Sequence, residues 1–532
     1  MSSLCSAAGL GRAALLLGFA VLAGCAHAPP PVPADARARL FALALQDIGD
    51  IYIEPVSDRR LVLFGLANLS RLDRNLAVVE TPASENRTAL ALTYRDRQLA
   101  LFSPPADNDG IGWGKVMSQA IAAARAASPI VAAHADERIE DVVFDGMTDA
   151  LDRFSRYSAP AAARAERTTL EGFSGIGITL EEGNGGFSVG AVLPQSPAAR
   201  AGVEPGDRIV AIDGHPTAGR PRAEIVGRLH GPLASTVELT VYRPALGRER
   251  SLAIRRELVV PPTVAAAEQD GVAIFHITGF SRDTTERLAA DLVRAAHRPG
   301  PGLRGIVLDL RGDPGGLLEQ AAEVSNLFIA RGPIAATIGR NPASRQLFAA
   351  SGAAVAPAVP IVALIDGGSA SAAEIVAAAL QDARRAVVVG SASYGKGTVQ
   401  TVLPLPNGGE LTLTWALLVR PSGYLLDGHG VIPDVCTSGL AENRRSLPTV
   451  LARLRAAPAP AQAAMPAPLD EAAWRRLRRA CPARTDGRNL DLGVAERLLA
   501  DPDLYRDALA SSRRPTALTE PPAPLISASP TP

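Results

Sequence analysis

The chain has 532 residues, of which 47% are hydrophobic and 20% charged, and its acidic and basic side chains balance to a net charge of zero. This length predicts several domains, and the composition supplies enough apolar side chains for more than one core. The sequence has no basic patch with interleaved aromatic residues, which argues against a nucleic-acid partner.

The first 24 residues have the pattern of a targeting segment. Arg12 is their only charged residue, and an apolar run follows over 13–23 that is too short to span a bilayer. The run ends in LAGC at 22–25, which resembles the end of a bacterial lipoprotein signal, and the next residue is not aspartate, as in lipoproteins sent to the outer membrane. We expect a signal peptide over 1–24, lipid on Cys25 and an extended tether over 25–34. An ordinary cleaved signal peptide is the alternative.

Residues 35–165 predict a mainly helical domain. Apolar residues keep helical spacing to about Ala77, and the spacing returns over 115–127 and 138–154. The alternating stretch at 87–103 predicts a small hairpin between these helices.

Residues 172–257 have the order of elements of a PDZ domain. GIGITL at 175–180 is a strand opened by glycines, a second strand and a short helix follow it, and residues 222–229 predict a longer helix. Such a domain adds a peptide beside the glycine-opened strand, and loop N–H groups donate to the peptide's terminal carboxylate. A lid without a ligand is the alternative. The candidate peptide-binding residues are Gly175, Ile176, Gly177 and Ile178.

Residues 260–437 alternate strands with helices, which is typical of a layered α/β core. Within this region, residues 361–365 predict a buried strand, and a turn of small residues leads from it into an apolar helical run. Ser371 lies at that turn, where helix N–H groups can stabilise an oxyanion. A second buried strand begins at Ala386 and is followed by Gly395-Lys396-Gly397.

Lys396 is unusual because only two of the 54 basic side chains are lysines, the other being Lys115. Arginine does not release its proton near neutral pH, whereas a desolvated lysine can. The neighbours of Lys396 in sequence carry no charge. We therefore expect Lys396 to lie away from carboxylates and to act as the base for Ser371.

Three motifs together resemble the carboxyl-terminal processing proteases, which are serine peptidases with a PDZ domain. They are DLRGDPGG at 309–316, GSASAAEI at 368–375 and YGKGTVQ at 394–400. The resemblance spans roughly residues 136–436, and residues 76–134 are interpreted as an insertion.

The resemblance implies a multidomain α/β (α+β) protein: a crotonase-like α/β protease core with an inserted PDZ domain and helical N- and C-terminal regions. It implies Ser371 as the nucleophile, Lys396 as the general base and Gln400 as the residue that positions the lysine. The implied oxyanion-hole residues are Gly315 or Gly316, and Ala372.

Two positions depart from the family pattern. Asp313 stands where asparagine is more usual, and we expect its side chain to point outward, because a charge beside the oxyanion would oppose it. His230 stands where the family commonly has an arginine that activates the protease, so this contact is either absent or pH-sensitive.

A serine–histidine pair is the competing interpretation of the site. His276 lies on an apolar strand and His429 in a GHG turn, and a lone strand histidine is more often a packed residue than a base. The sequence contains no HExxH, CxxC or paired-carboxylate spacing, so we expect neither a metal nor a cofactor.

Two of the four cysteines, Cys436 and Cys481, lie outside the N-terminal segment. In an oxidising compartment they either form a disulfide or stay as two buried thiols. Beyond the core, an Ala/Pro-rich stretch predicts a linker over 438–468, followed by a helical segment over 469–512 and a disordered tail over 513–532.

Together these features predict a serine endopeptidase on the periplasmic side of the bacterial envelope, held to the outer membrane by lipid. Its expected partners are polypeptides with exposed C-terminal tails, and a homo-oligomer or an activating adaptor is left open. One alternative is a catalytically inactive PDZ lipoprotein scaffold, against which the retained Ser371, Lys396 and Gln400 argue. The other is an acyl-CoA enzyme on the same kind of core, against which the signal peptide argues.

Overall fold

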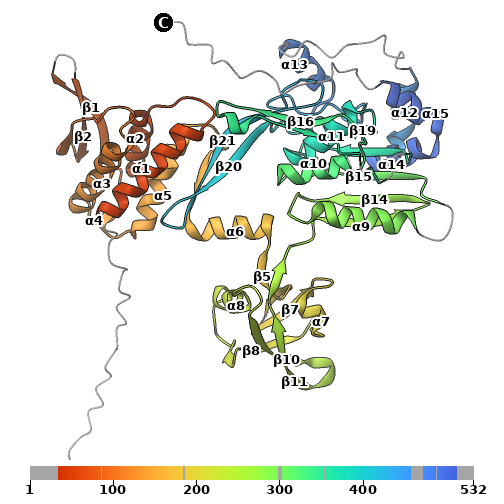
Figure 1. The fold of residues 1–532 in the computed structure, drawn as a ribbon, viewed down its shortest axis with the longest axis horizontal. Helices are drawn as coiled ribbons and strands as arrows, with labels where there is room; N and C mark the ends of the chain where they lie inside the picture. The colour runs from red at the N-terminus through yellow and green to blue at the C-terminus, as the bar shows by residue number, and fades with distance from the viewer. Residues whose placement is uncertain are drawn as a thin grey trace, which may run out of the picture.

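The computed structural model describes residues 34–511 except 85–86, 184–185, 298–301, 353, 356–357, 442, 457–470 and 487. The predicted signal peptide, most of the tether with Cys25 and the tail over 513–532 lie outside the described residues. The described chain forms an N-terminal domain, a PDZ domain and a catalytic core (Figure 1), and this multidomain α/β architecture confirms the predicted fold class. Among the described helices, none combines the length and the apolar character needed to cross a bilayer.

A six-stranded sheet forms the centre of the catalytic core. In spatial order its strands are β13 (Val264–Gln269), β14 (Val272–Ile277), β15 (Gly305–Asp309), β18 (Ile361–Ile365), β19 (Ala386–Gly390) and β22 (Val435–Cys436). Neighbouring strands are parallel except β13 and β14. Every residue of β15, β18 and β19 is buried, as expected for a parallel sheet that is covered on both faces.

Helices cover both faces of this sheet. One face carries α9 (Thr284–Ala296), α10 (Leu318–Asn326) and α11 (Ala372–Asp382), and the other carries α12 (Leu447–Ala456) after η4 (Arg444–Ser446), α14 (Arg488–Ala500) and α15 (Pro502–Ser511). The prediction of a linker over 438–468 is therefore wrong at α12, where Val450 is buried in one cluster with Val362. Leu447, Val450, Leu451 and Leu454 have the spacing of one helix face, and the Ala/Pro-rich stretch begins only after them.

A second sheet joins the core to the N-terminal domain. Its order is β17 (Gln346–Ala349), β16 (Pro333–Ile338), β21 (Glu410–Val419) and β20 (Thr398–Pro404), with β4 (Arg156–Ser158) beside β21 and η3 (Pro342–Ser344) before β17. The β20–β21 hairpin reaches from the core to the N-terminal domain (Figure 1). Leu411 and Leu413 of its far end pack in one hydrophobic cluster with Phe144 and Tyr157. The two domains therefore share a core.

The N-terminal domain packs helices against a three-stranded meander. Its elements are α1 (Ala34–Ile51), α2 (Asp58–Ala67), η1 (Asn68–Arg71), β1 (Leu76–Ser84), β2 (Arg87–Tyr94), β3 (Arg97–Phe102), α3 (Gly110–Ala127), α4 (Pro129–Ala132) and α5 (Asp136–Asp149), and α6 (Pro160–Glu171) follows β4. The predictions of helical structure to Ala77 and of only two strands are wrong, because β1 pairs with β2. Leu76 and Val78 pack on the core while Ala77 is exposed, which is the period of a strand.

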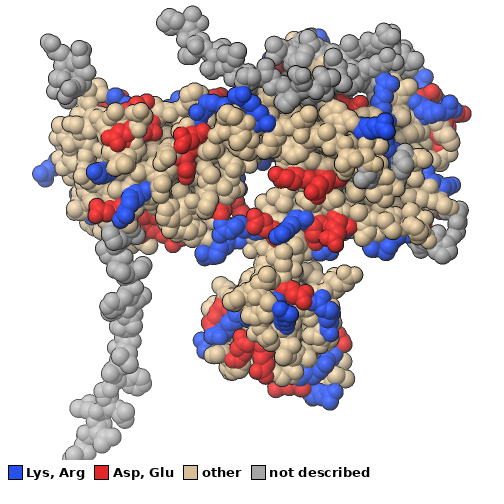
Figure 2. Space-filling view, in the orientation of Figure 1, with Lys and Arg blue, Asp and Glu red and all other residues tan. Residues whose placement is uncertain are grey.

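The PDZ domain lies below the other two domains in this view, and a narrow connection joins it to them (Figures 1 and 2). Its elements are β6 (Ile178–Gly183), β7 (Gly186–Val192), α7 (Pro197–Arg200), β8 (Arg208–Ile212), β9 (His215–Pro216), α8 (Arg222–Leu229), β10 (Thr236–Arg243), η2 (Pro244–Leu246) and β11 (Arg248–Arg255). The connection is a pair of antiparallel strands, β5 (Phe173–Gly175) and β12 (Glu257–Val259). β6 is an edge strand of the PDZ sheet, so its outer side is open to a peptide.

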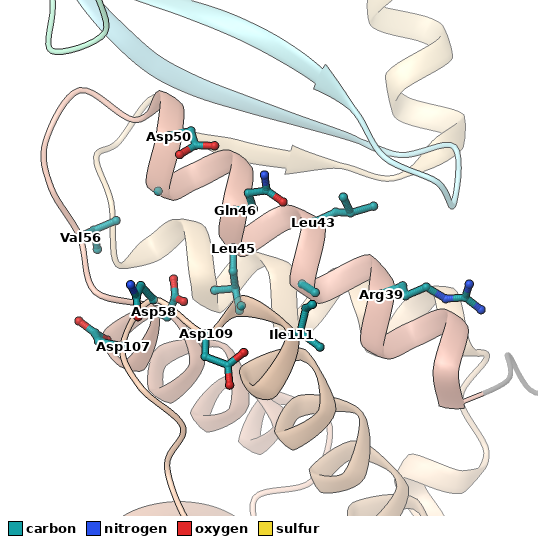
Figure 3. A pocket seen from close by; sticks show the side chains of 14 residues that line it. Arg39, Leu43, Leu45, Gln46, Asp50, Val56, Asp58, Asp107, Asp109 and Ile111 are labelled. Atoms are coloured by element: carbon teal, nitrogen blue, oxygen red, sulfur yellow. The ribbon is translucent and has the colours of Figure 1, made fainter.

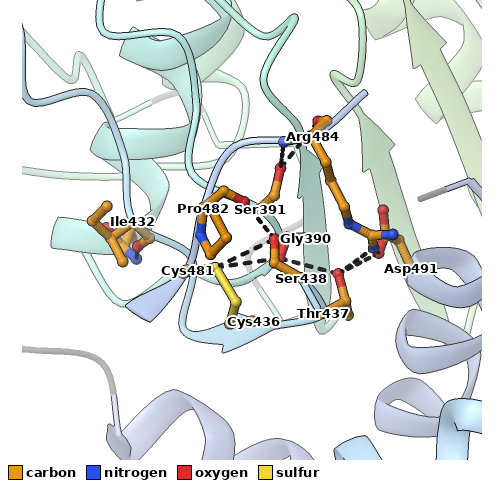
Figure 4. The surroundings of a disulfide bond; sticks show 11 residues. Gly390, Ser391, Ile432, Cys436, Thr437, Ser438, Cys481, Pro482, Arg484 and Asp491 are labelled. Atoms are coloured by element: carbon orange, nitrogen blue, oxygen red, sulfur yellow. Dashed lines mark hydrogen bonds and ion pairs between the residues drawn. A yellow bond between two sulfur atoms is a disulfide. The ribbon is translucent and has the colours of Figure 1, made fainter. Parts of the chain in front are cut away.

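A disulfide fixes the C-terminal segment to the core. Cys436 in β22 and Cys481, directly after α13 (Glu471–Ala480), form the bridge, which settles the alternative left open by the sequence (Figure 4). The two cysteines are 45 positions apart, and the chain-entropy relation gives about 4 kcal/mol of stabilisation for such a loop. Trp474 of α13 is buried against the rings of Tyr424 and His429.

Candidate active site

Ser371 precedes α11 on a turn that hydrogen bonds hold in place. Asp366, directly after β18, accepts through Oδ1 from the amides of Gly312 and Gly368, each at 2.9 Å. Ser371 itself has φ 54° and ψ −115°, a conformation that few residues with a side chain adopt. The fold therefore presents this serine on a strained turn at a helix N-terminus, where amide groups are at hand for a developing negative charge.

A cavity of about 420 Å³ brings together the side chains that the sequence predicts as catalytic. Ser371, Lys396 and Gln400 all line it, and so does Gly316 of the Pro314-Gly315-Gly316 turn. Much of the remaining wall is apolar: Leu170, Leu317, Leu318, Ile375, Val399, Val402 and Leu418. The charged residues Arg156 and Glu319 and several threonines also line it. The arrangement offers a hydroxyl, an amine and an amide to a polypeptide that enters a cavity of mixed polar and apolar character.

The environment of Lys396 favours its neutral form. Burial lowers the pKa of the Lys396 amine, and the positive charge of Arg156 lowers it further, whereas Glu374 and Asp152 act in the opposite direction. The Nζ atom lies 5.1 Å from the ring centroid of Phe154. The expectation that Lys396 lies away from carboxylates is therefore wrong, because α11 and the turn after α5 bring two of them near. Desolvation nevertheless outweighs them.

Gln400 is held by two threonine hydroxyls. Its Nε2 donates to Oγ1 of Thr398 at 2.7 Å and to Oγ1 of Thr414 at 3.2 Å. Thr414 in turn donates to Oδ1 of Asp152 at 3.1 Å. With the NH₂ group engaged in this way, Oε1 of Gln400 is the atom that can accept a hydrogen bond from an amine in the cavity.

The structure distinguishes between the two glycines predicted for the oxyanion hole. The amide of Gly315 donates to Oδ1 of Asp313 at 2.8 Å, whereas Gly316 lines the cavity. A Cβ on Gly315 would lie 2.8 Å from Cβ of Ser371 and 2.9 Å from the amide nitrogen of Ala372. Only glycine permits this approach, and Gly315 has φ 99°. Of the two glycines, the geometry therefore favours Gly316 as the donor. Ala372, the other predicted donor, is the first residue of α11 and is fully buried.

Asp313 does not point outward, so this prediction is wrong. The side chain is 0% exposed and turns into the protein, where the backbone of its own turn supplies a donor from Gly315. Burial raises the pKa of Asp313 to about 8, against the opposing effect of that hydrogen bond.

Glu374 is the functional residue that the sequence reasoning missed. Its carboxylate is 0% exposed and accepts through Oε2 from the amides of Ser371 at 2.8 Å and Lys396 at 2.9 Å. Through Oε1 it accepts from the amide of Gly395 at 2.7 Å and from the hydroxyl of Ser393. The spacing Ser371-x-x-Glu374 is that of a capping box and was the available signal.

Four donors converge on this carboxylate from two segments of the chain. Burial raises the pKa of Glu374, while hydrogen bonds from Ser393, Gly395, Ser371 and Lys396 lower it. A protonated carboxyl carries an O–H group, which would face another donor and find no acceptor among these partners. The set of partners therefore fits the ionised form.

The histidines do not compete for the role of base. His276 lies with Nδ1 3.6 Å from Oδ2 of Asp309, and Nε2 of His429 lies 3.0 Å from Oε1 of Glu471. Neither histidine lines the cavity that contains Ser371. Within the described part of the chain, the serine's cavity is thus lined by a lysine and by no histidine.

The PDZ domain has a groove of about 190 Å³ between β6 and α8. Ile176, Gly177 and Ile178 line it, and opposite them stand α8 residues such as Val226. Gly175, also predicted to bind peptide, instead pairs with Glu257 in the connecting strands. His230 lines the groove too, and its ring packs at a tilt against Phe173 with ring centroids 4.4 Å apart. Burial, and the charge of Arg256, lower its pKa.

A larger cavity, of about 810 Å³, lies in the N-terminal domain and shares no residue with the serine's cavity (Figure 3). Asp58, Asp107 and Asp109 gather at one end of it, and burial together with the two neighbouring carboxylates raises the pKa of Asp58 to about 6.

Across the described residues there is no group of three or more side chains arranged to hold a metal ion.

Comparisons with known proteins identify relatives of this chain. The model of peptidase family S41 matches residues 271–437, and a PDZ domain model matches residues 188–243. The chain is 37% identical over 302 residues to the carboxy-terminal-processing protease of Bartonella bacilliformis, covering 56% of this chain and 70% of that one. It is 33% identical over 303 residues to the carboxy-terminal processing protease CtpA of Bacillus subtilis, covering 56% and 64%.

Among solved structures, the photosystem II D1 C-terminal processing protease aligns over 76% of this chain and 93% of its own, with 21% identity and a TM-score of 0.38. The sequence relationship to the Bartonella protein is close enough to decide membership. The chain belongs to the carboxy-terminal-processing proteases, serine peptidases of family S41 that carry a PDZ domain.

Proposed function

We propose that this protein is an endopeptidase with a Ser371–Lys396 dyad that cleaves envelope polypeptides whose C-terminal tails are delivered by the PDZ groove. The observation that carries the proposal is the shared cavity, in which a strained serine meets a desolvated lysine and an anchored glutamine amide. No charged partner is needed to activate the serine, because a neutral amine is itself a sufficient base.

The chemistry follows from these positions. The neutral Nζ of Lys396 takes the proton of Ser371 as Oγ attacks the scissile carbonyl carbon, and the resulting oxyanion is held by the amides of Gly316 and Ala372. The ammonium then returns the proton to the leaving nitrogen as the C–N bond breaks, which leaves an acyl ester on Ser371. Lys396 next takes a proton from water, whose oxygen attacks the ester, and returns that proton to Oγ. Gln400 orients the amine through Oε1.

Lys396→Arg should abolish peptide hydrolysis and leave the fold intact. An unperturbed lysine is neutral in only about one molecule in 2,500 at pH 7, so the base depends on the lowered pKa, and arginine keeps its proton at any working pH. Hydrolysis by the wild type should rise with pH through that lowered pKa. The assay is cleavage of an unstructured polypeptide, with the melting temperature as the check on folding.

Lys115→Arg is the matched control, since Lys115 is the only other lysine and is exposed on α3. Ser371→Ala supplies the fully inactive reference. Substantial hydrolysis by Lys396→Arg would remove Lys396 from the role of base. Equal hydrolysis by wild type and Ser371→Ala would favour the inactive scaffold instead.

Glu374→Gln should lower kcat by at least about 10²-fold with little change in KM. In the variant, an NH₂ group replaces one carboxylate oxygen, so the two donors that faced this oxygen lose their acceptor. Each hydrogen bond lost at a charged acceptor is worth about 1.5–3 kcal/mol. Removing this carboxylate also removes an influence that raises the pKa of Lys396. The acid limb of the pH–kcat profile should therefore move to lower pH, a shift that a purely structural role would not produce. Glu249→Gln, on an exposed position of β11, is the control.

Peptides should bind the PDZ groove through a free C-terminal carboxylate. The motivation is the edge strand β6 beside a groove that opens at Gly177. Fluorescence anisotropy with a labelled peptide should show clearly weaker binding of the C-terminal amide than of the acid. Equal affinities would mean that the domain acts as a lid or a docking surface.

We propose further that Cys25 carries lipid and holds the enzyme to the outer membrane on its periplasmic side. Support comes from the LAGC ending of the apolar run and from the disulfide, since such bridges persist in oxidising compartments. The wild type should fractionate with membrane and Cys25→Ala with the soluble envelope fraction. A Cys25→Ala protein that stays with membrane would contradict the anchor.

A further inference from the structure

We propose that Asp313 is a positioning residue of the oxyanion turn and serves it in the uncharged, protonated form, so that its ionisation turns the peptidase off at alkaline pH. This inference rests on the proposed Ser371–Lys396 chemistry. It assigns to Asp313 the role of holding the turn without adding a charge beside the oxyanion.

Asp313 ties the glycine turn to the segment of the nucleophile. Its Oδ1 accepts from the amide of Gly315 at 2.8 Å, and its backbone carbonyl accepts from the amide of Ala370 at 2.9 Å. Ala370 directly precedes Ser371, and Gly315 directly precedes the donor Gly316. Both halves of the oxyanion hole are therefore positioned through this one residue.

The second carboxyl oxygen of Asp313, Oδ2, is buried and has no hydrogen-bond partner within the described chain. An anion so placed loses the solvation of its charge and gains no donor in return, whereas a neutral carboxyl leaves only an unpaired polar group. Burial is also the cause that raises the pKa of Asp313 to about 8.

Charged groups on the surrounding elements do not offset the energetic cost of burying an ionised Asp313. Those groups are Asp309 and Arg311 on its own segment, Asp283 before α9, Glu319 on α10, Asp366 and Glu374 on either side of the nucleophile, Lys396 and, beside Gly367, Arg484. Arg311 donates to both oxygens of Asp309 at 2.7 Å, and Arg484 donates to Asp491 at 2.9 Å. In the described structure, no hydrogen bond or ion pair joins any of these side chains to the carboxyl of Asp313.

Catalysis then has two opposite proton requirements. Lys396 must have lost its proton to act as base, and Asp313 must have kept its own. A carboxylate at position 313 would repel the second negative charge that develops on the tetrahedral intermediate. The pH–kcat profile is therefore bell-shaped, with the acid limb set by Lys396 and the alkaline limb by Asp313.

The test compares the pH dependence of kcat for the full-length wild type and Asp313→Asn. Asparagine keeps the acceptor for Gly315 and cannot ionise, so the variant should lack the alkaline limb. At pH 9, one unit above a midpoint of about 8, wild-type kcat should be roughly tenfold below that of the variant, with KM similar. Asp270→Asn, an exposed aspartate between β13 and β14, should keep the wild-type limb.

A second measurement follows thermal unfolding against pH. The unfolded aspartate titrates near 3.8 and the folded one near 8, so between these values the folded protein holds a proton that the unfolded chain has lost. Wild-type stability must then fall as pH rises through this window and level off above it. The melting temperature of Asp313→Asn should exceed that of the wild type by a margin that grows from about pH 4 to about pH 8.

An alkaline limb that persists unchanged in Asp313→Asn overturns the proposal, as does a wild type whose kcat stays level to pH 10, however the variant folds. A melting-temperature difference that does not change with pH also overturns it. Hydrolysis absent from the wild type at every pH would instead refute the proposed function, and the unfolding measurement would still decide the protonation of Asp313.

Discussion

The buried carboxylate of Glu374 holds the two catalytic segments of this protease together. α11 and the loop over 393–397 come from different parts of the core, yet the amides of Ser371 and Lys396 donate to the same oxygen atom. An ionised carboxylate only accepts, so it can satisfy four converging donors at once. Because the group is fully buried, water cannot replace a lost partner, and each of these bonds constrains the geometry strongly.

The C-terminal segment contacts the loop over 393–397, although this segment lies beyond the residues matched by the S41 family model. Arg478 of α13 donates to the carbonyl oxygens of His429 at 2.7 Å and Ser393 at 3.1 Å. Ser393 is also the residue whose hydroxyl donates to Glu374. The disulfide at Cys481 fixes the end of α13. A segment distant in sequence therefore stabilises the loop that carries Lys396.

Burial shifts the pKa values of two groups beside the nucleophile in opposite directions. The same loss of hydration that lowers the pKa of Lys396 raises that of Asp313, because in both cases it disfavours the charged form. Neighbouring charges modify this effect at Lys396, where Arg156 lowers the pKa further and Glu374 and Asp152 raise it. The same loss of hydration therefore favours an uncharged amine at Lys396 and an uncharged carboxyl at Asp313.

Apolar periodicity along the sequence predicted the layered core and the elements of the PDZ domain, because it depends only on neighbours along the chain. The resemblance of three motifs to the carboxyl-terminal processing proteases named Ser371, Lys396 and Gln400, which line one cavity. The sequence also contained the Ser371-x-x-Glu374 spacing, but it did not show that the loop over 393–397 donates hydrogen bonds to Glu374. Whether Asp313 faces in or out, whether Gly315 has a free amide and which carboxylates approach Lys396 were decided by the tertiary structure. These properties depend on burial and on contacts between distant segments, which only the packed fold creates.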